Sequence, residues 1–253
     1  MLRASGFSDR GRVRPTNEDC FAIHEDLGLC IVADGVGGHN AGEIAARMAV
    51  DAVADHFRLA NHNWPFGVDD RLSPAGNRIR NAILLANSQI HETALSTNQC
   101  AGMGTTLVAA WISSGRLTVG HVGDSRLYIV ADGMLRQVTQ DDSWLASMLA
   151  ADPSHDPLLL QHHPMRHALT NVIGARRSTD VHVLEEPLTG GELLLLTTDG
   201  VHGVLDERRI ASLMTRGDDL HTIAQNLVIS AMSRGTRDNC TAVVARYIPT
   251  VTH

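Results

Sequence analysis

The chain has 253 residues and a formal net charge of −7, and 43% of its residues are hydrophobic. This is the composition of a folded globular protein that can bury a substantial core. The acidic balance argues against a surface for nucleic acid or anionic membranes, because such surfaces carry basic patches. The four cysteines have no CxxC spacing, which excludes a zinc knuckle and a disulfide framework, so we interpret them as reduced structural thiols.

The first residues lack the apolar segment of a signal peptide, and no apolar run reaches the ~18 residues needed to span a bilayer. We therefore expect a cytoplasmic monomer without nucleic-acid partners or membrane insertion. We expect one domain over residues 1–248, with residues 249–253 as a C-terminal tail.

Hydrophobic periodicity predicts alternating groups of strands and helices. Short apolar runs indicate buried strands, and apolar residues at i, i+4 spacing, such as Ile44 and Met48 or Ala45 and Ala49, indicate core-facing helices. In chain order we expect a strand over 29–33, a helix from near Asn40, a helix through 79–94, strands over 105–113, 116–122, 126–131 and 193–196, a helix through 220–231, and a strand over 239–247. The turn signal Asp132-Gly133 and the grouping of the strands predict antiparallel sheets with helices outside.

Two loops interrupt this pattern. Residues 61–74 are rich in Gly, Pro and Asp, and residues 152–164 are rich in Pro and His. The second loop lies in a candidate flap around residues 141–167. Four histidines gather there, but without metal-site spacing we interpret them as solvated flap residues outside the active site: His155, His162, His163 and His167.

Acidic residues recur at the ends of predicted strands. Asp34 and Asp199 are each followed by glycine, and Asp238 by asparagine, where the backbone can turn sharply. Converging carboxylates without paired His or Cys favour Mg²⁺ or Mn²⁺ over Zn²⁺, and two such ions can activate a shared water. Taken singly, each Asp-Gly is more simply a turn, so spacing alone leaves the metal site open.

Seven blocks in order along the chain resemble the PPM, or type 2C, metal-dependent serine/threonine protein phosphatases, especially their compact bacterial members. The blocks are Ser8–Gly11 with Arg14 and Asn17–Asp19, Val32–Glu43, Met103–Leu107, His121–Tyr128, Leu169–Gly174, Thr198–Val201 and Gly235–Thr241.

This resemblance implies an α+β fold, a four-layer αββα sandwich with two central antiparallel sheets. It implies that Asp34 bridges two metals, that Asp199 and Asp238 complete the first, and that the Gly35 carbonyl joins the second. Glu18 and Asp19 would then act mainly through metal-bound waters. By the same resemblance, Asp124 shares a third metal with Asp199, and Arg14 binds the substrate phosphate.

The implied activity is hydrolysis of protein phosphoserine and phosphothreonine by a metal-activated water, reversing a bacterial Ser/Thr kinase. The cofactors would be two Mn²⁺ or Mg²⁺ ions, with a third site possible in principle. A guanidinium such as Arg14 can hold two phosphate oxygens, which fits the chemistry independently. Its alternative is a solvated surface arginine.

Two departures from the family pattern leave questions open. Val36 stands where many eukaryotic members carry a histidine proposed as general acid, and Asp142 replaces a histidine near the flap. His39 could supply the proton or serve only the helix start, and a metal-bound water is the other candidate, so the general acid is unassigned. A catalytically silent binding module and a phosphatase for small phosphoesters are the alternative functions, although a silent module would be expected to lack one of the ligand carboxylates.

Overall fold

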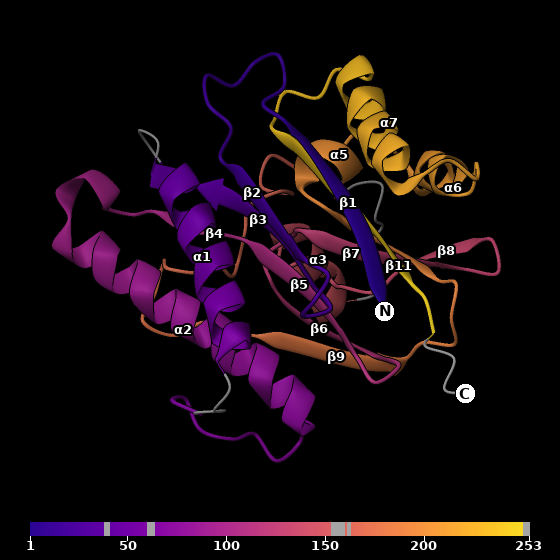
Figure 1. Ribbon diagram of the computed structural model, residues 1–253. Helices are drawn as coiled ribbons and strands as arrows, with labels where there is room; N and C mark the ends of the chain where they lie inside the picture. Colours follow the sequence, from indigo (N-terminus) through magenta and orange to yellow (C-terminus); the bar gives the residue numbers. More distant parts are fainter. Residues whose placement is uncertain (38–40, 60–63, 153–159, 161–162, 250–253) are drawn as a thin grey trace.

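Two antiparallel β-sheets pack face to face, and helices cover the outer face of each (Figure 1). The computed structural model describes residues 1–37, 41–59, 64–152, 160 and 163–249. Helices α1 (Ala41–Arg58) and α2 (Pro74–Ser96) cover one sheet, and α5 (Asp199–His202), α6 (Glu207–Met214) and α7 (Leu220–Ser233) cover the other. The predicted four-layer αββα sandwich is therefore confirmed.

The first sheet has five strands in the order β1-β11-β10-β7-β8, all antiparallel to their neighbours. It brings the start of the chain beside its end, with Leu2 paired to Tyr247. The strands are β1 (Leu2–Asp9), β7 (Arg126–Ala131), β8 (Met134–Gln137), β10 (Leu193–Thr197) and β11 (Cys240–Tyr247).

The second sheet has the order β2-β3-β5-β6-β9, with the short β4 paired to β3. All of these pairings are antiparallel too. The strands are β2 (Asp19–His24), β3 (Leu29–Val36), β4 (Gly104–Thr105), β5 (Leu107–Ser113), β6 (Arg116–Val122) and β9 (His182–Pro187). A 3₁₀ turn, η1 (Asn98–Cys100), links α2 to this sheet.

The core lies in three layers, which explains why the central strands are continuous apolar runs. In β3, Leu29 and Ile31 face α1 and α2, whereas Cys30 and Val32 face the other sheet. Because both faces of these strands are buried, alternation between apolar and polar residues is absent. The third layer packs α6 and α7 on the outer face of the five-stranded sheet.

Several predicted elements differ in detail from those observed. The strand predicted over 105–113 is two strands, because the chain leaves regular pairing at Thr106. Ile44 is 42% exposed, so the core face of α1 is formed by alanines such as Ala45 and Ala49, not by Ile44. The start of that helix near Asn40 lies outside the described residues, within which it begins at Ala41. The hairpin turn is confirmed, with positive φ at both Asp132 and Gly133 between β7 and β8.

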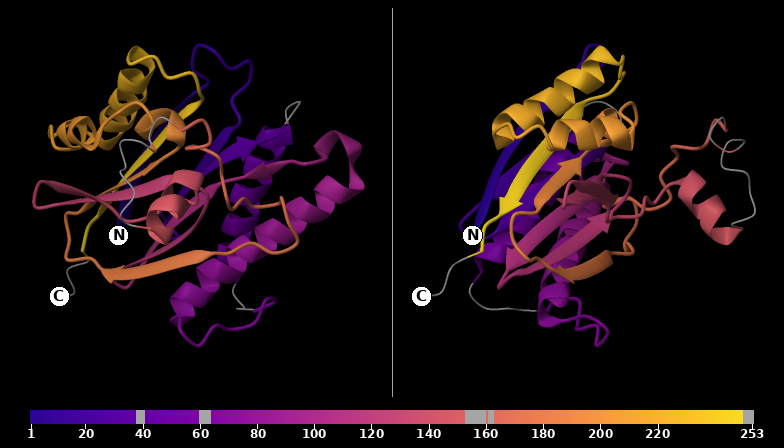
Figure 2. Two further views of the ribbon diagram at one scale, coloured as in Figure 1. Left: turned by 180° about the vertical axis from the view of Figure 1, so that it is seen from behind. Right: turned by 90° about the vertical axis from the view of Figure 1, so that its right-hand side faces the viewer.

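The flap region stands apart from the sandwich. It contains α3 (Trp144–Ala151), capped by the Ser143 hydroxyl, and this helix projects away from both sheets (Figure 2, right). None of its residues is fully buried. Among the helices described, none is long and apolar enough to cross a membrane.

Candidate active site

The predicted site residues converge at one end of the sandwich. Asp34 lies near the end of β3, Asp124 in the turn after β6, and Asp199 at the start of α5 directly after β10. Asp238 precedes β11. They surround a cavity of about 260 Å³ lined by Arg14, Glu18, Asp34, Gly35, Val36, Gly37, Thr106, Asp124, His167, Leu169, Asp199, Asp238 and Asn239.

Close backbone packing fixes the two Asp-Gly steps. A Cβ on Gly200 would lie 1.8 Å from the Asn239 carbonyl oxygen, and one on Gly35 would lie 2.1 Å from the Gly42 carbonyl oxygen. Only glycine fits at either position. Asp34 stays within β3, and its N–H donates to the Thr106 hydroxyl at 3.1 Å. Asp199 starts a helix, so neither aspartate lies in the simple turn that its sequence suggested.

The carboxylates are buried together with little positive charge nearby. Burial and the other aspartates raise the pKa of Asp124 to about 7 and that of Asp34 well above its ordinary value. Burial and the charge on Asp238 raise the pKa of Asp199 to about 6, although a hydrogen bond with Asp34 opposes this shift. Without a cation, the cluster therefore favours keeping protons.

The same carboxylates have the chemistry of ligands for divalent cations. The Oδ1 atoms of Asp199 and Asp19 are buried and have no hydrogen-bond partner among the residues that the structure describes. Carboxylate oxygens are the ligands that Mg²⁺ and Mn²⁺ prefer, and an ion would replace the protons that burial favours. In the described part of the chain, no three acidic, His or Cys side chains already form a tight ligand set.

Asp19 lies behind the cavity wall. It is paired with Asp34 in the β2–β3 ladder, and its Oδ2 accepts hydrogen bonds from the Thr198 and Thr241 hydroxyls at 2.8 and 2.7 Å. Burial raises its pKa to about 7 despite these bonds. Asp19 therefore connects three strands of the site but does not line the cavity.

Arg14 extends from the loop between β1 and β2 to the cavity wall. Its Nη2 donates to Asp238 Oδ2 at 2.6 Å, and its side chain is half exposed. The hydrogen bond with Asp238 raises the pKa of Arg14, opposed by partial burial. A half-exposed guanidinium at the mouth of an acidic cavity can reach an anion there.

Asn239 is a site residue that the sequence did not single out. Its side chain donates to the carbonyl oxygens of Arg10 and Thr16 and accepts from the Glu18 N–H, all at 2.8 to 2.9 Å. These bonds tie the loop that carries Arg14 to the start of β11. The only sequence signal was its place beside Asp238.

Asp142, which replaces a histidine of the family pattern, joins the flap to the sheet. Its carboxylate accepts from the Gly123 N–H at 2.9 Å, from Asn171 Nδ2 at 2.9 Å and from His182 Nε2 at 2.8 Å. Burial raises the pKa of Asp142, but these hydrogen bonds outweigh it and lower the pKa overall. Asp142 thus fixes the turn that precedes Asp124.

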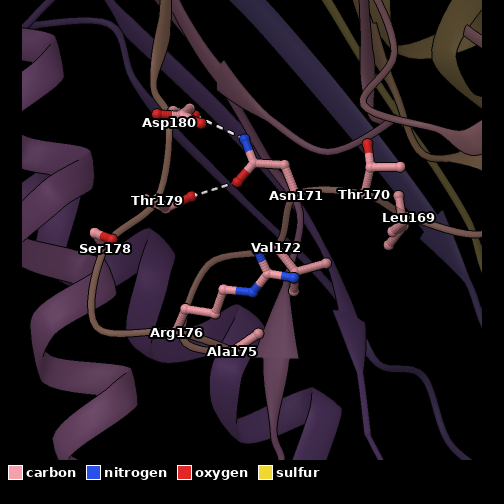
Figure 3. A pocket seen from close by; sticks show the side chains of 9 residues that line it. All are labelled: Leu169, Thr170, Asn171, Val172, Ala175, Arg176, Ser178, Thr179 and Asp180. Carbon is pink, nitrogen blue, oxygen red and sulfur yellow. Dashed lines mark hydrogen bonds between the residues drawn. The ribbon is translucent and has the colours of Figure 1, made fainter. Parts of the chain in front are cut away.

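A second cavity, of about 240 Å³, lies beside the first on the segment after the flap. Figure 3 shows Asn171 at its rim, donating to the Asp180 carbonyl oxygen and accepting from the Thr179 hydroxyl. The Arg176 side chain extends toward Val172 (Figure 3). Leu169 lines both cavities, so the two share one wall.

The flap histidines separate in the structure. His163 stacks on Trp144 with ring centroids 4.2 Å apart, as a flap residue outside the site. His167 lines the acidic cavity, although its loop context had predicted a place outside the site. Its position could not be read from the loop composition, because it depends on how the flap returns to the sheets. His39, His155 and His162 lie outside the described residues.

Comparisons with known proteins agree with this fold. The family profile of Protein phosphatase 2C matches residues 11–226. Serine/threonine phosphatase stp of Listeria monocytogenes is 30% identical over 255 residues, covering 96% of this chain and 95% of that protein. Serine/threonine protein phosphatase PstP of Mycobacterium tuberculosis is 33% identical over 254 residues, covering 97% of this chain and 45% of that protein.

A solved structure gives the same result. The catalytic domain of the serine/threonine protein phosphatase PstP in complex with two manganese ions superposes with a TM-score of 0.82 at 29% identity, covering 98% of this chain and 99% of that one. The chain belongs to the Protein phosphatase 2C family. Within this metal-dependent family it is a serine/threonine protein phosphatase, homologous to the bacterial phosphatases Stp and PstP.

Proposed function

We propose that the acidic cavity holds two Mn²⁺ or Mg²⁺ ions and hydrolyses phosphoserine and phosphothreonine in proteins. The observation that carries this proposal is the set of buried carboxylates around one cavity with Arg14 at its mouth. Asp34 would bridge the ions, Asp199 and Asp238 would bind the first, and the Gly35 carbonyl would join Asp34 on the second.

Three further acidic residues complete the proposed metal site. Asp124, whose pKa burial raises to about 7, would share a third ion with Asp199. Glu18 and Asp19 would act through water. The family resemblance supports these assignments, and the unpaired Oδ1 atoms of Asp19 and Asp199 support them independently. When bound, the ions would neutralise phosphate charge and lower the pKa of the attacking water.

Arg14 would hold the substrate phosphate. Its present partner, Asp238, is also a proposed metal ligand, so a bound cation would draw that carboxylate away from the guanidinium. The guanidinium N–H groups of Arg14 would then donate to two phosphate oxygens in a bidentate arrangement. These hydrogen bonds would strengthen as negative charge accumulates on the phosphoryl oxygens in the transition state.

The biological substrates would be proteins phosphorylated by a Ser/Thr kinase of the same cell. The names of the relatives, which are serine/threonine phosphatases, support this class of substrate. We also propose that residues 1–248 act as one catalytic domain, with the flap at 141–167 selecting among phosphoproteins. The presence of a carboxylate at every proposed ligand position argues against a silent binding module.

The test is release of phosphate from p-nitrophenyl phosphate and a phosphothreonine peptide, with Mn²⁺ or with chelator. Wild type should hydrolyse both only with metal, and Asp199→Asn should lose at least ~100-fold in kcat. Asp132→Asn is the matched control, because it changes an Asp-Gly aspartate in the β7–β8 turn, where asparagine tolerates the positive φ. Turnover in chelator, or full activity of Asp199→Asn, would contradict the proposed site. Activity on the small ester alone would favour a small-molecule phosphatase.

A further inference from the structure

Hydrolysis of a phosphoserine or phosphothreonine releases an alkoxide, which is a strongly basic leaving group and needs a proton. A positioned side chain that supplies it contributes about 10²–10⁴-fold to the rate. Arg14 remains protonated and cannot serve as this acid. The carboxylates on the cavity wall are proposed to bind metal ions directly or through water. Val36, at the position of the histidine proposed as general acid in other family members, has no acidic proton.

His167 is the remaining titratable side chain among the described residues that line the cavity. We propose that His167 is the general acid that protonates the departing serine or threonine oxygen. The inference rests on the proposed function of the acidic cavity. It also gives the flap a catalytic part, since His167 belongs to that segment and not to the sheets.

The backbone around His167 is held while its ring is left free. The Ala168 N–H donates to the Met165 carbonyl at 2.8 Å, and the Ala168 carbonyl accepts from the Trp144 N–H at 2.8 Å. Thr170 N–H donates to the Asp142 carbonyl at 2.9 Å. The His167 ring is exposed and, within the described residues, makes no hydrogen bond, so both ring nitrogens can meet a substrate.

The charges around His167 suit an acid that gives up its proton readily. Partial burial and the nearby cations Arg166 and Arg126 lower the pKa of His167, while Asp141 opposes them. A phosphate dianion entering the cavity would favour the imidazolium by direct attraction. Among the described residues, the other charged or titratable groups in this region are His202, whose pKa is lowered by burial, by Arg126 and by His167, and the cavity residues Arg14, Glu18, Asp34, Asp124, Asp199 and Asp238.

Water adds its oxygen to phosphorus and loses one proton, while the bond between phosphorus and the serine or threonine oxygen breaks. The electron pair of that bond goes to the leaving oxygen, which takes a proton from the His167 imidazolium and departs as a neutral alcohol. The neutral imidazole regains a proton from solvent, so the proton lost by water is matched and the products are inorganic phosphate and the alcohol.

His167→Gln tests this role through the leaving group. p-Nitrophenolate is far less basic than an alkoxide and departs without a proton. The variant should therefore lose about 10²–10⁴-fold in kcat on a phosphothreonine peptide but no more than about threefold on p-nitrophenyl phosphate. With the peptide, wild-type kcat should fall on the alkaline side of the pH profile as the imidazolium deprotonates, and the variant should lack this limb.

His163→Gln is the matched control, because His163 also lies in the flap but stacks on Trp144 and does not line the cavity. It should retain both activities. An equal loss of both activities in His167→Gln would indicate a structural role and overturn the proposal, as would full retention of both. A wild-type protein without metal-dependent peptide hydrolysis would instead overturn the proposed function.

Discussion

Asn239→Ala tests whether hydrogen bonds to the backbone position the phosphate-binding arginine. The side chain is 5% exposed and makes three hydrogen bonds, to Arg10, Thr16 and Glu18 in the loop that carries Arg14. At about 1 kcal/mol net for each bond, the variant should lose ~3 kcal/mol of unfolding free energy. In a chain of this size, that loss corresponds to a fall of about 6–12 °C in Tm.

The functional loss should exceed what stability alone explains. A displaced Arg14 forfeits a charged hydrogen bond to phosphate, about 1.5–3 kcal/mol, which lowers kcat/KM for a phosphothreonine peptide by ~10–100-fold. Asn87→Ala is the matched control, since Asn87 is 1% exposed and makes three comparable bonds to Arg176, Arg177 and Gly174, away from the acidic cavity.

The assay pairs urea unfolding in chelator with steady-state peptide kinetics in Mn²⁺, for wild type and both variants. Both variants should lose similar unfolding free energy, and only Asn239→Ala should lose kcat/KM. Equal kinetic constants in the two variants would refute the positioning role of Asn239.

Three further predictions concern charge and packing in the site. In metal-free protein, the pKa of Asp199 is raised from 3.8 to about 6, so its ionisation destabilises the folded state progressively between these two pH values and by a constant amount above them. Asp199→Asn should therefore be about 3 kcal/mol more stable than wild type at pH ~8 and equal to it below pH ~3. The Asp142–His182 pair should stabilise the fold only at pH values between the lowered pKa of Asp142 and the raised pKa of His182. The gain should be under about 1 kcal/mol because the His182 side chain is half exposed. Urea unfolding of wild type and His182→Gln across pH measures it. Gly200→Ala should lose at least about 4 kcal/mol of unfolding free energy or fail to fold, because its Cβ would meet the Asn239 carbonyl oxygen at 1.8 Å.

Each of these has a distinct contrary result. With saturating Mn²⁺, wild type should become more stable than Asp199→Asn. A metal-free Asp199→Asn that is less stable than wild type at alkaline pH would contradict the electrostatic reasoning. A His182→Gln effect that persists above the raised pKa of His182 would show that the pair is not ionic. A well-folded Gly200→Ala with wild-type Tm would contradict the close packing at the start of α5.

The strands found from the sequence were the central ones, and those missed were at the edges. The strands β1, β2, β8 and β9 are the four sheet edges, and their residues are mostly half buried or exposed. An edge strand has one neighbouring strand and mixes polar with apolar residues, so its sequence contains no apolar run that would predict a strand. The central strands are buried on both faces and were predicted to within three residues at either end.

The site residues that could be predicted were likewise those with a local sequence signal, and those missed depend on long-range contacts. Asp34 and Asp199 were identifiable because each follows a buried strand and precedes a glycine that close backbone packing requires. The place of Asn239 depends on contacts 221 to 229 residues away in sequence, which no local pattern encodes. His167 was excluded for its loop context, since only the return path of the flap brings it to the cavity.

The central claim is that carboxylates meeting at the end of the sandwich bind the ions that drive hydrolysis. Calorimetric titration with Mn²⁺ of the metal-free chain and of Asp34→Asn tests it most directly. The account predicts at least about two bound ions per chain in wild type. It predicts that Asp34→Asn, which removes the proposed bridge, loses both high-affinity sites. Undiminished Mn²⁺ binding by Asp34→Asn would contradict it.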